Sequence, residues 1–198
     1  MSRALPILFN TEMVWAILDG IKGSTRRIVK GFIPNDAVWG YTAFTPKGYI
    51  SCRGTFADGY GEKFFKLPCE PGNILYVRET WKKAPNGYYY YEDWQRNDIA
   101  DVTKWKPSIH MPKEAARIWL KVTDVRVERS QEITIDGIRN EGISSMAVHA
   151  GDMEIALKEW KNLWNSTIKK TDLDSYGWDA NPWVWVIEFE RCEKPEGV

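Results

Sequence analysis

Residues 183–190 read WVWVIEFE, the most regular alternating run in the chain and the one that decides its fold class. In an extended strand, Trp183, Trp185, Ile187 and Phe189 point to one side and the residues between them point to the other. The run therefore predicts a β-strand near the end of the sequence, with a row of large apolar side chains along one face.

Further strands and helices are expected upstream of this run. Apolar or alternating segments predict strands at residues 4–9, 26–30, 73–77 and 115–128. Apolar residues at helical spacing predict helices at residues 12–19, 133–143 and 153–168. Strands at both ends, with local helices between them, favour an α+β chain built on a small mixed barrel over a doubly wound parallel sheet.

The composition is that of a globular protein of 198 residues, with 43% hydrophobic and 27% charged residues. We expect one domain over residues 1–191 and a loose tail at 192–198. Lys and Arg number 27 and Asp and Glu number 27. A net charge of zero argues against a protein that coats duplex nucleic acid by bulk charge, but it permits a local basic groove.

Aromatic residues are abundant, with eleven Trp, nine Tyr and seven Phe. Such rings either fill a core or offer flat faces to a planar ligand, and composition does not distinguish the two. A long segment at residues 78–112 shows little periodicity and holds several of these rings. A connection of this length inside a compact domain is more often functional than idle.

The three cysteines, Cys52, Cys69 and Cys192, match no disulfide framework. Cys52, Cys69 and His110 together fit no known zinc spacing, so free thiols in a reducing compartment are favoured and we expect no metal and no cofactor. The sequence has no basic start followed by a long apolar run and no apolar stretch of roughly 20 residues. We therefore expect a cytoplasmic protein without a membrane partner.

The first candidate for chemistry is the segment at residues 20–27, GIKGSTRR, directly after a helix that Gly20 is expected to end. A tight turn would gather the side chains of Lys22, Thr25 and Arg27 near one point. Lys22 could bind an anion or, if desolvated, act as a general base, and Thr25 could hydrogen-bond a ligand or act as a nucleophile. The alternative is a solvated basic turn that joins a helix to a strand.

Two further segments carry candidate ligand-binding residues. Arg78, Glu79 and Trp81 follow a predicted strand, where polar residues often line a cleft and a Trp ring can stack on a base. The alternative is that Arg78 and Glu79 pair on the surface while Trp81 caps the core. Ser108 and His110 lie in a loop bounded by prolines, where a lone histidine is more often a structural hydrogen-bonding residue than a catalyst.

Taken together, these stretches resemble the ASCH family of PUA-like β-barrels, in a form common among phage and prophage proteins. The match spans nearly the whole chain and rests on an ordered set of motifs: the Gly-x-Lys-x-x-Thr-x-Arg pattern at 20–27, LYVRETW at 75–81, SIHMP at 108–112, VTDVRVE at 122–128, EGI at 141–143 and WDANPWVWV at 178–186. The resemblance implies a small mixed barrel with peripheral helices, a long inserted loop at about 78–112, and a cleft suited to RNA or a nucleobase.

A shorter bacterial branch with a similar pattern hydrolyses N4-acetylcytidine with a Lys, a Thr and a Glu. Carried over by motif, these residues are Lys22, Thr25 and Glu141. Arg27 or a backbone N–H would then stabilise the oxyanion. The pattern usually has Arg and Thr where this chain has Ile21 and Gly23.

Three functions follow from these observations. The first is a module that binds RNA or a nucleoside through aromatic rings and basic side chains. The second is a small amidohydrolase that removes an acyl group from a modified nucleoside. The third is an adaptor for a protein partner, which the sequence does not identify. We rank binding first and hydrolysis second.

Overall fold

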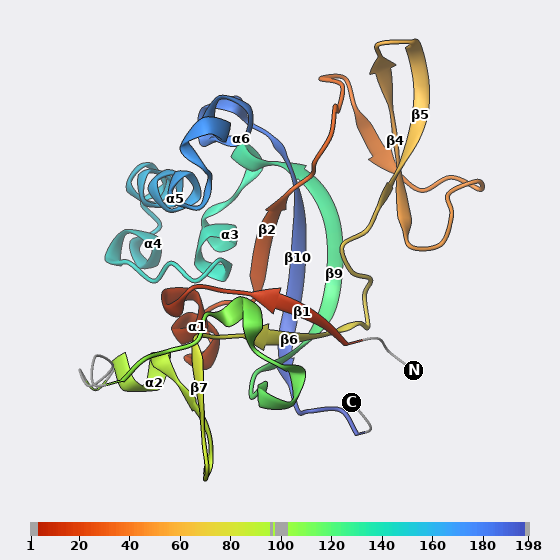
Figure 1. The fold of residues 1–198 in the computed structure, drawn as a ribbon. Coiled ribbons are helices and arrows are strands. Elements are labelled where there is room, and N and C mark those ends of the chain that lie inside the picture. Colours follow the sequence, from red (N-terminus) through yellow and green to blue (C-terminus); the bar gives the residue numbers. More distant parts are fainter. Residues whose placement is uncertain (1–3, 96, 98–102, 197–198) are drawn as a thin grey trace.

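The computed structural model describes residues 4–95, 97 and 103–196, and it has a mixed α+β architecture with several sheets (Figure 1). The main sheet has five strands in the order β1-β6-β9-β10-β2. Their bounds are Ala4–Leu8 for β1, Ile74–Arg78 for β6, Trp119–Arg129 for β9, Trp183–Cys192 for β10 and Ser24–Ile28 for β2. Strand β1 runs parallel to β6, and the other neighbours are antiparallel.

The alternating run at residues 183–190 forms strand β10, as predicted, and this strand lies between β9 and β2 in the main sheet. Trp185, Ile187 and Phe189 belong to the large core cluster on one face of the sheet. Val184 and Val186 belong to a second cluster on the other face, with helix residues. The strand is therefore buried on both faces, which explains why apolar residues occupy both sets of alternating positions.

The hydrogen-bonded order leaves β1 and β2 at opposite edges of the main sheet, so the described strands form no closed barrel. Helix α1 (Thr11–Leu18) connects these two edge strands. The side chain of Asn10 caps its first turn by accepting a hydrogen bond from the backbone N–H of Met13. Gly20, at φ 74°, follows the end of the helix in the left-handed region that a glycine adopts without steric cost.

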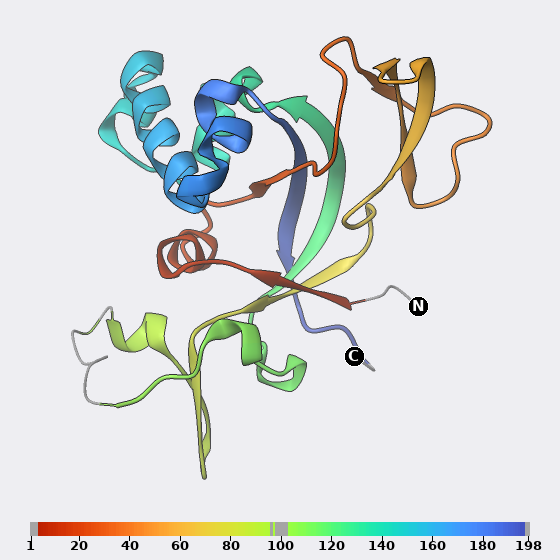
Figure 2. The same cartoon turned by 45° about the horizontal axis from the view of Figure 1, so that its top comes forward.

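A second sheet, in the order β3-β4-β5, projects from the main body (Figure 2). We call this sheet the arm; its strands are β3 (Val38–Gly40), β4 (Tyr49–Phe56) and β5 (Gly59–Lys66). Ile50 is part of the large core cluster, and Trp39 and Phe65 pack against it. One face of the arm is thereby fixed against the main sheet.

The four α-helices that follow β9 in the sequence gather on the side of the main sheet that carries β2 (Figure 2). Helices α3 (Ile135–Asn140) and α4 (Met146–Ala150) both contact α5 (Met153–Thr167), and α6 (Leu173–Tyr176) follows. Short 3-10 turns complete the structure at Ser108–His110, Lys113–Ala115, Ser130–Glu132, Lys170–Asp172 and Trp178–Ala180.

The segment at residues 78–112 has more regular structure than its sequence suggests. It forms the hairpin β7 (Trp81–Ala84) and β8 (Gly87–Tyr90), followed by α2 (Tyr91–Gln95). Its lack of apolar periodicity reflects half-buried tyrosines, which leave no clean polar face. Among the described residues, none of the helices combines the length and the apolar composition needed to cross a bilayer.

Candidate functional site

The amine of Lys22 and the carboxylate of Glu141 form a buried ion pair. Lys22 Nζ lies 2.9 Å from Glu141 Oε2 and also donates to the Glu141 backbone oxygen at 2.7 Å. Lys22 is 4% exposed and Glu141 is 2% exposed. Two of the three residues implied as catalytic by the ASCH resemblance are therefore in direct contact, although 118 residues separate them in the sequence.

The backbone around both residues brings them together. The N–H groups of Ile21 and Lys22 donate to the oxygen of Ala16, and the N–H of Gly23 donates to Asn140 O at 2.9 Å. Gly142 has φ 102°, and a Cβ built there would lie 2.9 Å from the Ala16 side chain. A glycine is required at this position because the end of α3 approaches α1 too closely for a side chain.

Arg26 shares Glu141 with Lys22. Its guanidinium donates to Glu141 Oε1 at 3.0 Å and to Glu128 Oε2 at 3.4 Å, and it lies 6.0 Å from the centre of the Trp160 ring. Arg26 Nε is buried without a hydrogen-bond partner in the structure. Sequence reasoning did not single out Arg26, yet it is the second cation bound to Glu141.

Burial dominates the electrostatics of Lys22. Desolvation lowers the pKa of its amine below the ordinary value, and the charge and hydrogen bond of Glu141 oppose this effect only in part. The positive charges of Arg27 and Arg26 act in the same direction as burial. Lys22 is thus more easily deprotonated than an exposed lysine.

Two small cavities lie between α1 and α5, and we call this region the cleft. One cavity, of about 50 Å³, is lined by Thr25, Arg27, Glu141 and the rings of Trp160 and Trp164, among others. The other, of about 80 Å³, lies beside Glu141 and Gly142. Met13, Glu141 and Leu163 line both cavities, so the two adjoin.

Thr25 lies on β2 rather than in the turn that we expected before it, and Arg27 lies on the same strand, as expected. The strand begins at Ser24, two residues earlier than predicted, because Ser24 pairs with Glu188 and Thr25 pairs with Ile187 of β10. Thr25 is buried. Arg27 is exposed; its guanidinium donates to Leu8 O at 2.8 Å and lies 5.5 Å from the centre of the Phe9 ring.

The remaining predicted ligand-binding residues lie elsewhere, and none of them lines either cleft cavity. Arg78 donates to Ile109 O at 3.1 Å, so it does meet the turn that carries Ser108 and His110. Glu79 is fully buried, and Trp81 belongs to a third core cluster.

Glu79 is part of a buried acidic cluster that no local sequence pattern indicates. Arg117 donates to both carboxylate oxygens of Glu79, at 2.7 Å to Oε2 from its terminal nitrogen, and also binds Asp93. Glu92, which is 1% exposed, lies beside them on α2. Burial raises the pKa of the Glu92 carboxyl to about 7, and the charge of Glu79 acts in the same direction.

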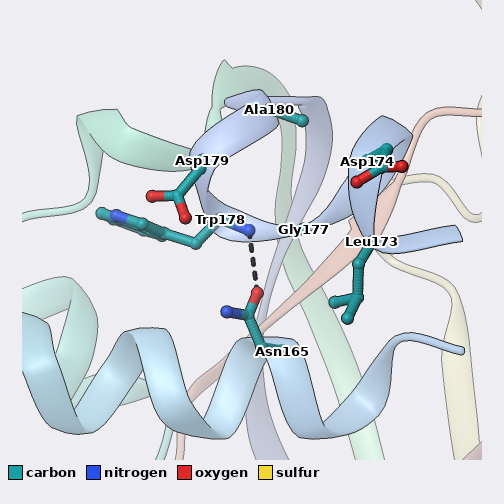
Figure 3. Close-up of a pocket in the computed structure, with 7 residues that line it drawn as sticks. All are labelled: Asn165, Leu173, Asp174, Gly177, Trp178, Asp179 and Ala180. Carbon is teal, nitrogen blue, oxygen red and sulfur yellow. Dashed lines mark hydrogen bonds between the residues drawn. The ribbon is translucent and has the colours of Figure 1, made fainter. Parts of the chain in front are cut away.

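Two other cavities have acidic linings. One, of about 380 Å³, lies at the corner between α5 and α6 and is lined by Asp174 and Asp179 (Figure 3). The other, of about 230 Å³, lies on the far side of Arg26 and is lined by four carboxylates and two guanidinium groups. A phosphate group would meet net negative charge in both cavities.

The part of the chain that the structure describes contains no cluster of three or more His, Cys, Asp or Glu side chains fit to hold a metal ion. Its three cysteines are free thiols. The chain matches no model of a known protein family, no curated protein sequence and no solved structure.

Proposed function

We propose that this protein binds a nucleoside, or an unstacked base of an RNA strand, in the cleft between α1 and α5. The observation that carries the proposal is the buried ion pair between Lys22 and Glu141, because Glu141 lines both adjoining cavities while Lys22 lies behind it and lines neither. A buried ion pair is seldom more stabilising than apolar packing of the same volume. Ionisable groups buried at a cleft floor, with one shifted pKa, are therefore more typical of a functional site than of a structural one.

The residues around the cleft have complementary roles in this proposal. The carboxylate of Glu141 accepts a hydrogen bond from an exocyclic amine of the base, and the hydroxyl of Thr25 bonds the polar edge beside it. Arg27 is exposed next to the cleft and interacts with a phosphate or ribose. The assignment of the main sheet to the PUA-like barrels belongs to the same proposal and is supported by the order of the sequence motifs.

Cavity size limits what enters. Pockets that enclose a whole small molecule usually measure about 300–1,000 Å³, whereas the two cleft cavities measure about 50 and 80 Å³. We therefore expect one polar edge of the base to enter the cleft while the sugar stays outside, near Arg27.

Calorimetric titration with cytidine, N4-acetylcytidine and adenosine tests the binding proposal. We expect saturable binding that Thr25→Val and Arg27→Ala each weaken about tenfold, because each removes one polar contact worth roughly 1.4 kcal/mol. Lys170→Ala, which removes an exposed cation that lines neither cleft cavity, is the control and leaves nucleoside affinity unchanged. Absence of heat with all three nucleosides and with their 5′-monophosphates would rule out the proposal.

A second function, hydrolysis of an acylated nucleoside, is favoured by the lowered pKa of Lys22. In this reaction the neutral amine takes the proton of Thr25, and the Thr25 oxygen attacks the acyl carbon. The amide C–N bond breaks, the amine leaves with the proton, and water then hydrolyses the acyl ester on Thr25. Both hydrogen bonds that the structure gives the Lys22 amine go to Glu141, so Lys22 must turn toward Thr25 when substrate binds.

Chromatography of N4-acetylcytidine incubated with the protein separates the two functions. Conversion to cytidine that is lost in Thr25→Val and in Lys22→Met supports hydrolysis at this site. Conversion that persists in both variants places the reaction elsewhere. Saturable binding without any conversion leaves the protein as a binding module.

A further inference from the structure

Exposed aromatic side chains gather on the arm and on the loops next to it. Eleven large hydrophobic side chains of the described residues are exposed, and five of them are aromatic: Phe32, Tyr41, Phe44, Tyr60 and Phe64. All five lie between residues 32 and 64, on the arm or on the loops that lead into it. A cluster of exposed apolar side chains often marks a binding surface, whereas exposed apolar side chains scattered singly do not.

The strand register places two of these rings on one face of the arm. Tyr60 and Phe64 are four residues apart on β5, so they point to the same side at a spacing of about 13 Å. Their partners on β4 are Thr55 and Ser51. Tyr60 is 74% exposed and Phe64 is 39% exposed. The opposite face holds Ile50 and Phe65 against the main core, whereas Tyr60 and Phe64 do not pack on that core.

Charged side chains share this outer face with the rings: Glu62 lies between Tyr60 and Phe64 on β5, and Arg53 lies opposite Glu62 on β4. Lys66 follows Phe64 by two residues and lies directly opposite Tyr49 in the register, and Arg53 lies on that face of β4. Lys66 and Arg53 are exposed. Glu62 also points to this side, where the hydroxyl of Ser51 donates to its carboxylate.

A groove continues from this face at the base of the arm. It has a volume of about 540 Å³, several times that of the cleft cavities, and Lys47, Tyr49 and Lys66 are among its lining residues. Glu70 is the one acidic residue in the lining. Tyr49 and Lys66 therefore belong both to the groove and to the outer face, so the two form one continuous surface.

From this arrangement we propose that the outer face of the arm, with the groove at its base, binds single-stranded nucleic acid. Rings on the face of a sheet stack on unpaired bases, and the nearby lysines and arginine contact the phosphates. A net charge of zero is compatible with such a surface, because binding requires only local cations, here Lys47, Arg53 and Lys66. This site is separate from the cleft and does not depend on nucleoside binding there.

Fluorescence anisotropy with labelled ten-nucleotide rU and dT strands tests the proposal. We expect Tyr60→Ala and Phe64→Ala each to weaken binding about 5- to 100-fold, whereas Tyr60→Phe retains the stacking ring and most of the affinity. The double variant Lys47→Ala/Lys66→Ala should reduce the slope of log affinity against log salt by about 1.4, since two phosphate contacts are lost. Lys158→Ala/Lys170→Ala, which removes two exposed lysines outside the arm, leaves that slope unchanged.

The outcomes separate this site from the cleft. Arm variants that lose the oligonucleotide but still bind nucleosides, together with an Arg27→Ala variant that still binds the oligonucleotide, support two sites. No oligonucleotide binding at low salt, or affinity that the arm variants do not change, overturns the proposal. A duplex of ten base pairs that binds as tightly as the single strand also contradicts it, because paired bases cannot stack on the rings. Concentration-dependent self-association that Tyr60→Ala abolishes, without any nucleic-acid binding, would reassign the face to a second copy of the chain.

Discussion

Glu141 binds the amine of Lys22 twice, through its backbone oxygen at 2.7 Å and its carboxylate at 2.9 Å. The residue that ends α3 thus fixes the position of the lysine that follows α1. Because the other carboxylate oxygen accepts a hydrogen bond from Arg26, one acidic residue holds two cations in a region that water scarcely reaches. The stability of the cleft is consequently linked to the charge of the Lys22 amine.

The first prediction concerns this ion pair. Lys22→Met keeps the side-chain length but removes the charge, and it leaves Glu141 paired with Arg26 alone. We expect the free energy of unfolding to fall by about 3 kcal/mol, the lower end for breaking a buried pair. Urea unfolding followed by tryptophan fluorescence measures the change. Lys158→Met, an exposed position on α5, is the control, and equal stability of the two variants would show that the pair contributes nothing.

The second prediction concerns the approach of α3 to α1. Gly142→Ala introduces a Cβ 2.9 Å from the Ala16 side chain at a φ of 102°. We expect the free energy of unfolding to fall by about 2–4 kcal/mol, because the substitution combines backbone strain with a steric clash. Gly151→Ala is a matched control, since φ is 77° there and a Cβ would meet open space. It should cost only about 1 kcal/mol, and a cost at position 142 no larger than that would exclude the clash.

The third prediction is a pH dependence from Glu92. Its pKa is about 7 in the folded protein, against an ordinary value of 4.5. Between these two pH values the folded state binds more protons than the unfolded state, so stability declines as pH rises and levels off above about 7. The full decrease in the free energy of unfolding over this pH range is roughly 3 kcal/mol.

The Glu92→Gln variant provides the measurement for this dependence. Its stability, followed by thermal unfolding from pH 4.5 to 8, should decline less with pH than that of the unmodified chain. Any residual slope would come from the neighbouring Glu79, whose pKa burial also raises despite the bonds from Arg117. Glu193→Gln, which is exposed, should retain the whole dependence. Parallel curves for all three proteins would contradict the shift.

The fourth prediction concerns thiol reactivity. Burial raises the pKa of all three thiols, to about 11 for Cys52 and Cys69, but only Cys192 is partly exposed. The reacting species is the thiolate, so iodoacetamide at pH 8 should modify Cys192 first and leave the other two until the chain unfolds. Peptide mass mapping over time gives the order. Modification of Cys52 at the rate of Cys192 in the native protein would contradict this order.

The sequence predicted those elements whose pattern depends on local chemistry. The run at residues 183–187 is apolar throughout because β10 is buried on both faces there, and Asn10 and Gly20 bound α1 through capping and positive φ. Strand β2 was predicted two residues late. Its first residues, Ser24 and Thr25, are polar, and only their pairing with β10 makes them part of the strand.

What the sequence could not predict depends on contacts between distant segments. No local pattern indicates that Arg26 meets Glu141 or that Arg117 meets Glu79, because each pair joins elements that come together only in the folded sheet. Lys22 and Glu141 were associated through family resemblance alone. The exposed rings of the arm could not be predicted either. Phe and Tyr also occur in the core, so residue type alone does not tell which rings face solvent.

Strand β2 lies at an edge of the main sheet, with β10 as its partner. Edge strands detach at a lower free-energy cost than central ones, so amide hydrogens of β2 should exchange with solvent before those of β9 and β10. Such an opening would carry Thr25 and Arg27 away from Glu141 without unfolding the rest of the molecule. The cleft would then be present only in molecules in which β2 is docked. A ligand bound in the cleft would therefore slow amide hydrogen exchange along β2.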